Sequence, residues 1–377
     1  MAVVMAAHGR FSHPFEPVIG RVSETVAVAS PADTVLVCRS GRVPDVDLSS
    51  FAAVLMEGRE AEGPRIGAYD DLSHLADGDL VMVDGTNGRT RTLFRRGSPH
   101  NALFVTERCN SNCLMCSQPP KDDDGMLGTC HRIIGLLKDQ PPVRLGITGG
   151  EPTLFGVGFV RLLEHLKADL PNTAITSLSN GRTFADPALV SAIAAVRHPN
   201  LRFSIPLHAD VPDVHDHIAQ ARGAFHQTLA GFYNLEAHGI EAEIRVVLHA
   251  QSVPRLGQLA EFVWRKLPFV AQVAFMGLEQ MGYVKKNWDS LWIDPIDYAD
   301  GLLAASEHLF RRGVDVSIYN LPLCVLPQAA WGLARKSISD HKQILIEECA
   351  GCAVRDHCPG FFTSGTARPS RAISRII

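Results

Sequence analysis

Three cysteines stand close together in the stretch CNSNCLMCSQPP, at residues 109–120: Cys109, Cys113 and Cys116. A structural zinc site closes with four protein ligands, and no fourth cysteine or suitably placed histidine follows nearby, since Cys130 lies 14 residues beyond Cys116. Three thiolates can instead hold an iron–sulfur cubane in which one iron stays open to a substrate or cofactor. The spacing therefore predicts a cluster with an open iron, and a zinc loop is the alternative.

A second group of cysteines lies near the C-terminus. Such clusters in a chain of 377 residues without an apparent export signal more often bind metal or do redox chemistry than form disulfides. Four thiols with an internal Cys-x-x-Cys can close either a structural zinc site or a second cluster, and the ligand count alone does not choose. The group consists of Cys324, Cys349, Cys352 and Cys358.

The segment from residue 99 supplies a scaffold for these groups. Apolar runs that predict strands alternate there with amphipathic stretches that predict helices, which is typical of a parallel α/β sheet with right-handed crossovers. Six such units are too few for a closed eight-stranded barrel, so we expect a partial (β/α)6 TIM-type barrel or an open doubly wound sheet, with the chemistry at the carboxyl ends of the strands. The strand candidates span residues 102–106, 143–148, 174–179, 201–206, 241–249 and 269–277.

Three domains are predicted. Residues 1–98 form a small β-rich domain, in which two strand-like runs flank the hairpin signal Asn87-Gly88. Residues 99–294 form the α/β core. Residues 295–377 form a C-terminal extension with one helix, a strand-like run at 314–319 and the second cysteine group.

The cysteine spacing on the loop after the first strand resembles that of the radical S-adenosylmethionine (radical SAM) superfamily. The resemblance implies a [4Fe-4S] cluster on Cys109, Cys113 and Cys116 whose open iron chelates the amino and carboxylate groups of SAM. It also implies that one electron from the cluster cleaves SAM to a 5′-deoxyadenosyl radical, chemistry that no side chain supplies unaided.

The same resemblance implies cofactor-binding residues at the ends of several strands. Two glycines let the backbone approach a ligand closely, and a neighbouring carboxylate can accept hydrogen bonds from an ammonium group. The TGGEP element, with Gly149, Gly150 and Glu151, is thereby expected to bind the SAM amino group. The remaining residues are Ser179 and Asn180 for the ribose, Ser204 or His208 facing the cofactor, Arg245 for the SAM carboxylate, Met115 against the adenine and Asn110 shaping the loop.

Longer phrases narrow the resemblance to the radical SAM maturases of the His-Xaa-Ser system. These phrases are LFVTERCNSNCLMCSQPP, MGLEQMGYVKKN after the sixth strand, and a tail similar to those that hold auxiliary clusters. The resemblance implies a ribosomal peptide substrate, a partner radical SAM protein and an external electron donor such as flavodoxin or ferredoxin. It favours an auxiliary [4Fe-4S] cluster over zinc in the tail.

Composition sets further expectations. With 36 basic and 40 acidic side chains the formal charge is −4, so nucleic acid is not an expected partner. No run of 18 apolar residues and no signal-peptide pattern is found in the sequence, so we expect no membrane span and a cytoplasmic location. Two alternatives remain: a radical SAM enzyme acting on a small molecule or RNA, and a non-catalytic zinc-binding adaptor.

Overall fold

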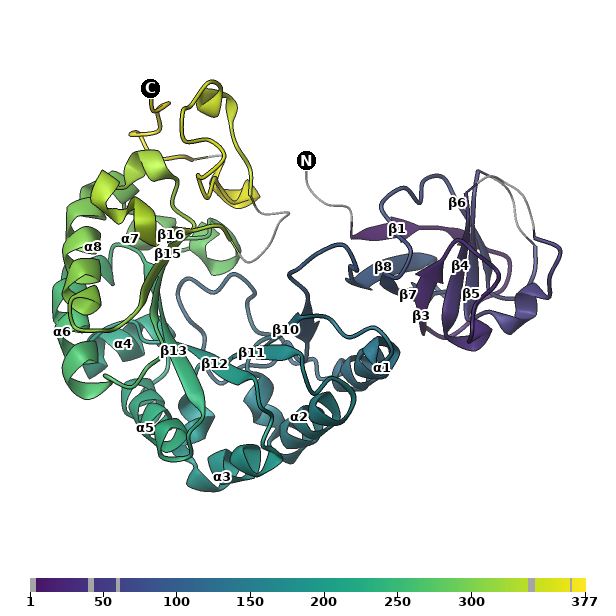
Figure 1. Cartoon of the computed structure of the whole chain (residues 1–377), viewed down its shortest axis with the longest axis horizontal. Coiled ribbons are helices and arrows are strands. Elements are labelled where there is room, and N and C mark those ends of the chain that lie inside the picture. The colour runs from purple at the N-terminus through teal and green to yellow at the C-terminus, as the bar shows by residue number, and fades with distance from the viewer. Residues whose placement is uncertain (1–4, 40–43, 59–61, 338–342, 367) are drawn as a thin grey trace.

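The computed structural model describes residues 5–39, 44–58, 62–337, 343–366 and 368–377. These residues build two eight-stranded sheets, one on each side of residue 98. Figure 1 shows the N-terminal sheet as a separate body on the right, and the second sheet curving through the larger body on the left.

The N-terminal sheet confirms the predicted β-rich region. Strands β3 to β6 pair in parallel, whereas β7 and β8 form the antiparallel hairpin predicted at Asn87 and Gly88. Gly88 has a φ of +72°, and the Asn87 amide donates to Asp84 Oδ2 at 2.7 Å, which stabilises the turn. The strands are β1 (Ala6–His8), β2 (Arg10–Phe11), β3 (Val18–Ser23), β4 (Thr34–Cys38), β5 (Ala53–Glu57), β6 (Ile66–Tyr69), β7 (Leu80–Asp84) and β8 (Arg89–Phe94).

The second sheet contains only parallel pairings, from β9 at one edge to β16 at the other. Its first six strands correspond to the six predicted ones. The edge strands do not pair with each other, so the sheet is open, and the prediction of a partial TIM-type barrel is confirmed. Beyond residue 294 two more strands extend the sheet. The strands are β9 (Ala102–Phe104), β10 (Arg144–Thr148), β11 (Ala174–Leu178), β12 (Leu201–Pro206), β13 (Glu241–Leu248), β14 (Val273–Gly277), β15 (Val316–Tyr319) and β16 (Ala334–Arg335).

Helices cover the outer, convex side of this sheet (Figure 1). Two of them begin at an aspartate followed by proline: Asp186 accepts a hydrogen bond from Ala188 N at 2.9 Å, and Asp294 accepts one from Ile296 N at 3.2 Å. The helices are α1 (Leu127–Leu137), α2 (Val157–Asp169), α3 (Pro187–Val196), α4 (Pro212–Ala219), α5 (Ala224–Ala237), α6 (Leu256–Lys266), α7 (Trp288–Leu291) and α8 (Pro295–Phe310).

The two faces of the barrel sheet differ in character. Residues that point toward the helices, such as Phe203 and Ile244, are fully buried and apolar. Their neighbours on the inner face, such as Thr176, Arg245 and Tyr319, are only half-buried. The inside of the open barrel therefore carries polar side chains among apolar ones and is partly accessible, in contrast to the packed interior of a closed eight-stranded barrel.

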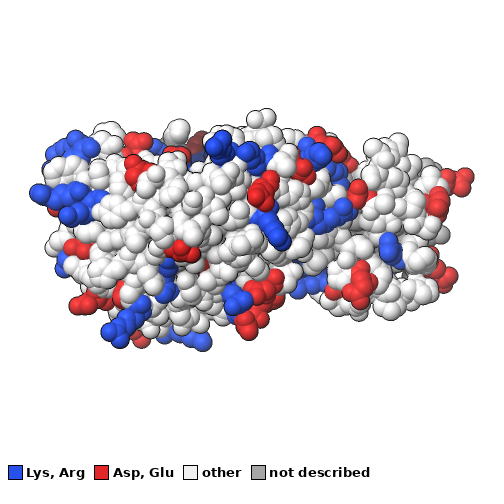
Figure 2. Space-filling model, turned by 90° about the horizontal axis from the view of Figure 1, so that it is seen from below, with Lys and Arg blue, Asp and Glu red and all other residues white. Residues whose placement is uncertain are grey.

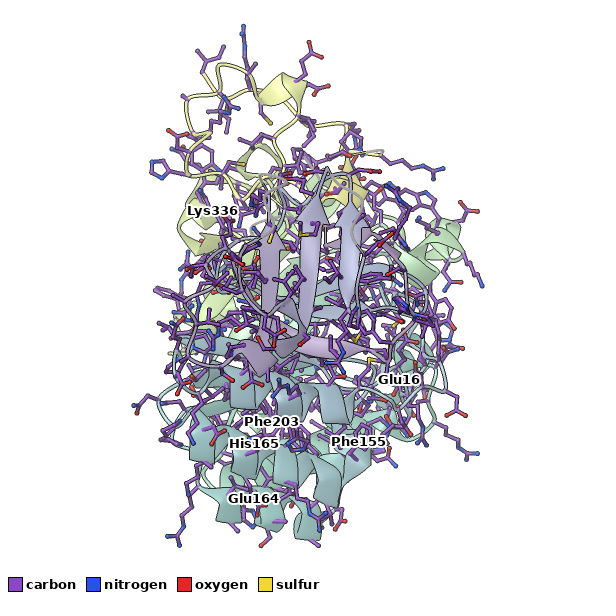
Figure 3. All side chains as sticks on the ribbon, turned by 90° about the vertical axis from the view of Figure 1, so that its right-hand side faces the viewer. Glu16, Phe155, Glu164, His165, Phe203 and Lys336 are labelled. Carbon is purple, nitrogen blue, oxygen red and sulfur yellow. The ribbon has the colours of Figure 1, made fainter. Side chains whose placement is uncertain are left out.

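Hydrogen bonds and ion pairs join the N-terminal sheet to α1. Arg132 donates to Ile19 O at 3.2 Å and pairs with Asp33 at 2.5 Å. Arg96 donates to the backbone and side-chain oxygens of Gln140 at 2.9 and 2.8 Å. Figure 3, viewed from the side of the N-terminal sheet, shows Lys336 of the tail at the opposite end of the molecule from Glu164 of α2.

Charge is evenly mixed on the visible surface. On the face shown in Figure 2, basic and acidic side chains are interspersed between large uncharged areas. None of the helices in the described ranges combines the length and the apolar character that crossing a bilayer requires.

Candidate radical SAM site

The first three cysteines lie on the loop from β9 to α1, at the carboxyl edge of the barrel. Burial raises the pKa of each thiol, and the nearby Cys116 and Cys109 add to this effect on Cys113, raising its pKa to about 12. The sulfurs of Cys109 and Cys116 thus act electrostatically on that of Cys113. The positive charge of a bound metal centre would reverse these shifts and favour the thiolates, so the donor set fits such a centre.

Zinc and an iron–sulfur cluster make different demands on the cysteine sulfurs. Zinc draws four ligands to within about 2.3 Å of a single ion. In a cubane each cysteine binds a different iron, so the sulfurs stand further apart. In the described part of the chain, no three His, Cys, Asp or Glu side chains form a ready-made site for one metal ion.

The loop after β10 packs against the start of the cysteine loop. A Cβ on Gly149, whose φ is +148°, would lie 2.4 Å from Thr106 O, and one on Gly150 would lie 2.1 Å from Arg108 O. The backbone N–H groups of Gly150 and Glu151 donate to those same two oxygens, both at 2.7 Å. Any side chain at these two positions would clash with the backbone of the cysteine loop. The close packing of the two loops therefore requires glycine at both positions.

The loop after β11 holds the segment between the first two cysteines. Asn180 Nδ2 donates to Asn110 Oδ1 at 2.5 Å and lies 3.7 Å from Cys109 Sγ. Arg182 donates to Asn110 O and, at 3.0 Å, to Ser111 Oγ. The structure therefore gives Asn110 the loop-shaping contacts expected from the sequence, and Asn180 contacts the cysteine loop directly.

Helix α4 supports the middle of the cysteine loop. The N–H groups of Asn112 and Leu114 donate to the carbonyls of Ala219 and Ile218, at 3.1 and 3.0 Å, at the end of that helix. These carbonyls lack partners within the helix, so the loop satisfies them.

The loop after β14 supports the third cysteine. Tyr283 N donates to Cys116 O at 2.9 Å, and Asn287 Nδ2 donates to Leu114 O at 2.8 Å. Gly282 has a φ of +58°, and a Cβ there would lie 2.2 Å from Cys116 O. Together with the β10 loop, the β11 loop and α4, this loop fixes the cysteines from four parts of the barrel.

Glu151 is fully buried. Its carboxylate accepts hydrogen bonds from Thr153 N at 3.2 Å, Thr153 Oγ1 at 2.5 Å, Ser179 Oγ at 2.8 Å and Asn180 N at 2.5 Å. Burial raises the pKa of Glu151, although these donors oppose the shift. The carboxylate and the Ser179 hydroxyl therefore tie the β10 and β11 loops together.

Ser204 and Arg245 meet on a second buried carboxylate, Glu243. Ser204 Oγ donates to Glu243 at 2.6 Å, Arg245 Nε at 2.9 Å and Gln272 Nε2 at 2.5 Å. Burial alone would raise the pKa of Glu243, but the Arg245 charge and these hydrogen bonds outweigh it, so the pKa is lowered. Arg245 is thus held on the inner face of the barrel, whereas the Ser204 hydroxyl is occupied by Glu243.

Met115 and His208 are both enclosed by protein. Met115 is 8% exposed and packs in an apolar cluster with Ile218, Val284 and Leu291. His208 is 3% exposed, and its ring centroid lies 5.1 Å from that of His215. Burial lowers the pKa of His208 well below its ordinary value, so the ring is neutral. Neither side chain lies open to the inside of the barrel.

The four tail cysteines are brought together although 34 positions separate the first from the last. Burial, then Cys358 and Cys349, raise the pKa of Cys324, and burial, then Cys358 and Cys352, raise that of Cys349. These mutual effects link all four thiols into one group. Four thiols in one group can close either a structural zinc site or a second cluster.

Backbone N–H groups point at the tail sulfurs. Leu323 N donates to Cys358 Sγ at 3.4 Å, and Ile376 N donates to Cys352 Sγ at 3.4 Å. Such donors stabilise metal-bound thiolates and tune a cluster's potential. The tail also reaches the loop after β14, since Gln280 Nε2 donates to Arg368 O at 2.8 Å.

Sequence reasoning missed Arg182, Gly282, Tyr283, Asn287 and Glu243. Arg182 directly follows Gly181 after the predicted ribose residues, and Gly282, Tyr283 and Asn287 lie within MGLEQMGYVKKN. Their roles depend on contacts between loops that only the closed arc of strands brings together, so no local signal could have identified them.

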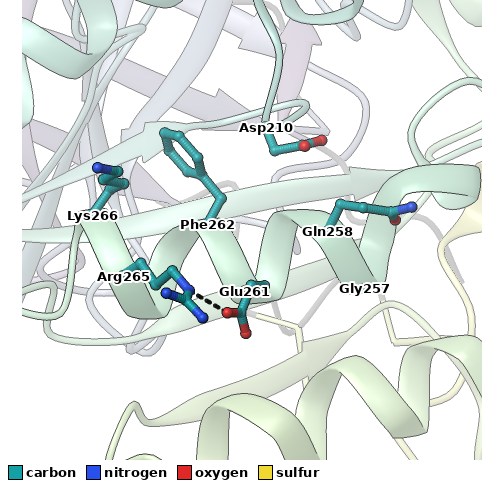
Figure 4. Close-up of a pocket in the computed structure, with 7 residues that line it drawn as sticks. All are labelled: Asp210, Gly257, Gln258, Glu261, Phe262, Arg265 and Lys266. Atoms are coloured by element: carbon teal, nitrogen blue, oxygen red, sulfur yellow. Dashed lines mark hydrogen bonds and ion pairs between the residues drawn. The ribbon is translucent and has the colours of Figure 1, made fainter.

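A groove of about 620 Å³ lies on the outer side of the barrel, along α6 (Figure 4). It is lined by Asp210, Gln258 and Phe262 together with the ion pair of Glu261 and Arg265. Asp210 is itself paired with Arg255 at 2.6 Å. The groove contains no cysteine and lies outside the strands' inner face, so we place the candidate active site at the cysteine loop instead.

Comparison with known proteins found one family match and several similar proteins. Residues 103–263 match the Radical SAM superfamily. An uncharacterized protein of Methanocaldococcus jannaschii is 23% identical over 172 residues, covering 44% of this chain and 59% of that protein. The crystal structure of Streptococcus suis SuiB bound to S-adenosylmethionine has a TM-score of 0.49 and 15% identity, covering 61% of this chain and 51% of that chain.

A radical SAM methyltransferase from Sphaerobacter thermophilus gives a TM-score of 0.44 and 13% identity, over 65% of this chain and 74% of that chain. This chain thus spans between one half and three fifths of the length of SuiB and of the curated relative. From the family match and the three-cysteine loop at the carboxyl edge of the partial barrel, we conclude that residues 103–263 form a radical SAM superfamily domain.

Proposed function

We propose that this chain is an enzyme that cleaves SAM reductively and abstracts hydrogen from a ribosomally synthesised peptide of the His-Xaa-Ser repeat type. One observation carries the proposal: the loop at residues 109–120 carries three thiols and no fourth cysteine, and it is fixed from four parts of the barrel. Glu151, which acts on Cys109, already accepts four hydrogen bonds. Arg182, which acts on Cys113, has no lone pair to offer.

Cys109, Cys113 and Cys116 would hold the [4Fe-4S] cluster, and Arg245 and the Gly149–Gly150 backbone would contact SAM. When bound, this cofactor pair supplies an electron and a hydrogen-abstracting carbon radical. The chain's own residues keep the loop rigid, since backbone and side-chain donors from four elements hold it. Glu243 orients Arg245 toward the inside of the barrel, where its cation would meet the SAM carboxylate.

The shape of the barrel supports a large substrate. The sheet is open between β9 and β16, and its inner face carries polar side chains and is half-buried. A peptide can enter such a surface from the side, whereas the core of a closed small barrel is filled with side chains. The phrases shared with the His-Xaa-Ser maturases point to a repeat peptide and to a partner radical SAM protein.

The tail would hold an auxiliary [4Fe-4S] cluster on Cys324, Cys349, Cys352 and Cys358. Four protein ligands would leave no open iron, so the chemistry that this cluster would supply is electron transfer rather than direct binding of the peptide. An external donor such as flavodoxin or ferredoxin would supply the electron for SAM cleavage.

Metal analysis and product detection test the proposal. Anaerobically reconstituted protein should contain about eight iron atoms per chain, as two cubanes require, and should form 5′-deoxyadenosine from SAM and a reductant. Cys113→Ala should abolish 5′-deoxyadenosine formation, whereas Cys38→Ala, a control in the N-terminal sheet, should retain it. Colourless protein with two zinc atoms per chain would refute the proposal in favour of a zinc-binding adaptor.

Substrate class is tested separately with a repeat peptide. Loss of hydrogen from a peptide bearing His-Xaa-Ser triplets, detected by mass spectrometry, is the expected result. SAM cleavage that proceeds with no change in the peptide, and that instead couples to a small molecule or RNA, would contradict the peptide assignment alone.

A further inference from the structure

Arg182 begins the short helix after β11 and reaches across to the cysteine loop. Its side chain donates to Asn110 O and to Ser111 Oγ, the latter at 3.0 Å, and these two residues lie between the first two cysteines. On its other side, Nε donates to Gln227 Oε1 of α5 at 2.7 Å. The guanidinium therefore bridges a rigid helix and the loop that carries the thiols.

The charge of Arg182 is not neutralised nearby. Within the described ranges no Asp or Glu forms an ion pair with it, and its partners are a carbonyl, a hydroxyl and an amide oxygen. Other arginines near the site differ: Arg108 pairs with Asp124, and Arg245 pairs with Glu243.

A fixed positive charge beside a thiolate-ligated cluster has a defined effect. Reduction adds one negative charge to a centre that already bears three thiolates, so a nearby cation stabilises the reduced form more than the oxidised form. In a partly buried site such an interaction is screened much less than at the surface.

We propose that Arg182 is a positioning residue that holds the Asn110–Ser111 segment and, through its un-neutralised charge, raises the reduction potential of the three-cysteine cluster. This inference rests on the proposed function. In the step concerned the external donor gives up one electron to the cluster, and no bond forms or breaks.

Gln227→Glu separates the charge of Arg182 from its positioning contacts. The substitution is isosteric, Gln227 is exposed, and the new carboxylate would pair with Arg182 Nε without touching the cysteine loop. Gln258→Glu on α6 is the matched control, because it makes the same charge change at an exposed glutamine on the outer side of the barrel (Figure 4). Arg182→Gln removes the charge and the bridge together.

The experiment is a redox titration of the reconstituted protein followed by electron paramagnetic resonance. The signal that changes when SAM is added identifies the three-cysteine cluster. At the wild-type midpoint, we expect Gln227→Glu to lower the ratio of reduced to oxidised cluster several-fold, because the new negative charge beside Arg182 opposes the charge that reduction adds. Arg182→Gln should shift it in the same direction, and Gln258→Glu should not.

Equal midpoint potentials in Gln227→Glu and Gln258→Glu would overturn the role assigned to the charge of Arg182. This holds when both variants carry their full iron content and cleave SAM normally. If Arg182→Gln loses iron, the Gln227→Glu comparison still decides the effect of the charge. A wild-type protein without any SAM-sensitive signal would instead overturn the proposed function, and the role of Arg182 with it.

Discussion

Gly282→Ala tests whether the loop after β14 positions the third cysteine, Cys116. Gly282 has a φ of +58°, and a Cβ there would lie 2.2 Å from Cys116 O and 2.6 Å from Ser117 O. Ordinary van der Waals contact begins near 3.4 Å, so the Cys116 backbone must move by roughly 1 Å or more. Because both neighbours are backbone atoms, no side-chain rotation can relieve the clash.

A matched control isolates this contact from backbone strain. Gly313 also has a positive φ, +79°, but a Cβ there meets nothing within 4 Å. Alanine in either position costs about 1–2 kcal/mol for the left-handed conformation. We therefore expect Gly313→Ala to lower the free energy of unfolding by that amount and to bind iron as the wild type does.

Gly282→Ala should pay the same conformational penalty and also displace Cys116. Outer-sphere support is typically worth 10- to 100-fold in metal affinity, so the three-cysteine cluster should be lost on mild chelation while the tail cluster remains. The assay is iron content after graded chelator treatment, combined with the SAM-sensitive paramagnetic signal. If Gly282→Ala keeps that signal as firmly as Gly313→Ala does, the loop after β14 does not position Cys116.

Three further predictions follow from the cysteine and histidine environments. Cys349→Ala should retain SAM cleavage but lose the peptide product; a normal yield of modified peptide would show that the tail cluster is not needed. In metal-free folded protein the pKa of Cys113 is about 12, so little of this thiol is a reactive thiolate at pH 8. Its alkylation, followed by mass spectrometry, should be at least about 100-fold slower than in urea; equal rates would contradict the burial of the Cys113 thiol. Burial lowers the pKa of His249 from 6.5 to about 4, so the unfolded state binds a proton more readily than the folded state does. The contribution of neutral His249 to the free energy of unfolding is therefore full above pH 6.5. It is lost, by about 3 kcal/mol, as the pH falls toward 4. His249→Gln should therefore flatten the loss of stability in denaturant titrations between pH 6.5 and 4, and an unchanged slope would refute the assignment.

The barrel could be predicted from the sequence because each strand–helix unit carries its own local pattern. The six strand candidates correspond to β9 through β14, and the Asn87-Gly88 turn joins β7 to β8. Local patterns do not predict which strands pair at the far edge of the sheet. The strand-like run at 314–319 lacks a signal for its partner, and only the structure shows that β15 pairs in parallel with β14.

The candidate site shows the same division. The spacing of Cys109, Cys113 and Cys116 is enough to indicate a cluster, because ligand number is a local property. The partners of Glu151 and Ser204 are not local: each side chain is a suitable cofactor ligand by type, yet strand pairing places a donor or an acceptor against it. These hydrogen bonds support the cysteine loop and Arg245, and no local pattern contains them.

The account's central claim is that the three cysteines leave one iron for SAM to complete. Electron–nuclear double resonance on the reduced protein, with SAM labelled with ¹⁵N at its amino group and ¹⁷O at its carboxylate, tests this claim most directly. We predict hyperfine couplings from both labels to the cluster in the wild type and in Cys349→Ala, and no SAM-coupled signal in Cys113→Ala. A reduced three-cysteine cluster whose spectrum shows no coupling to either label would contradict the claim.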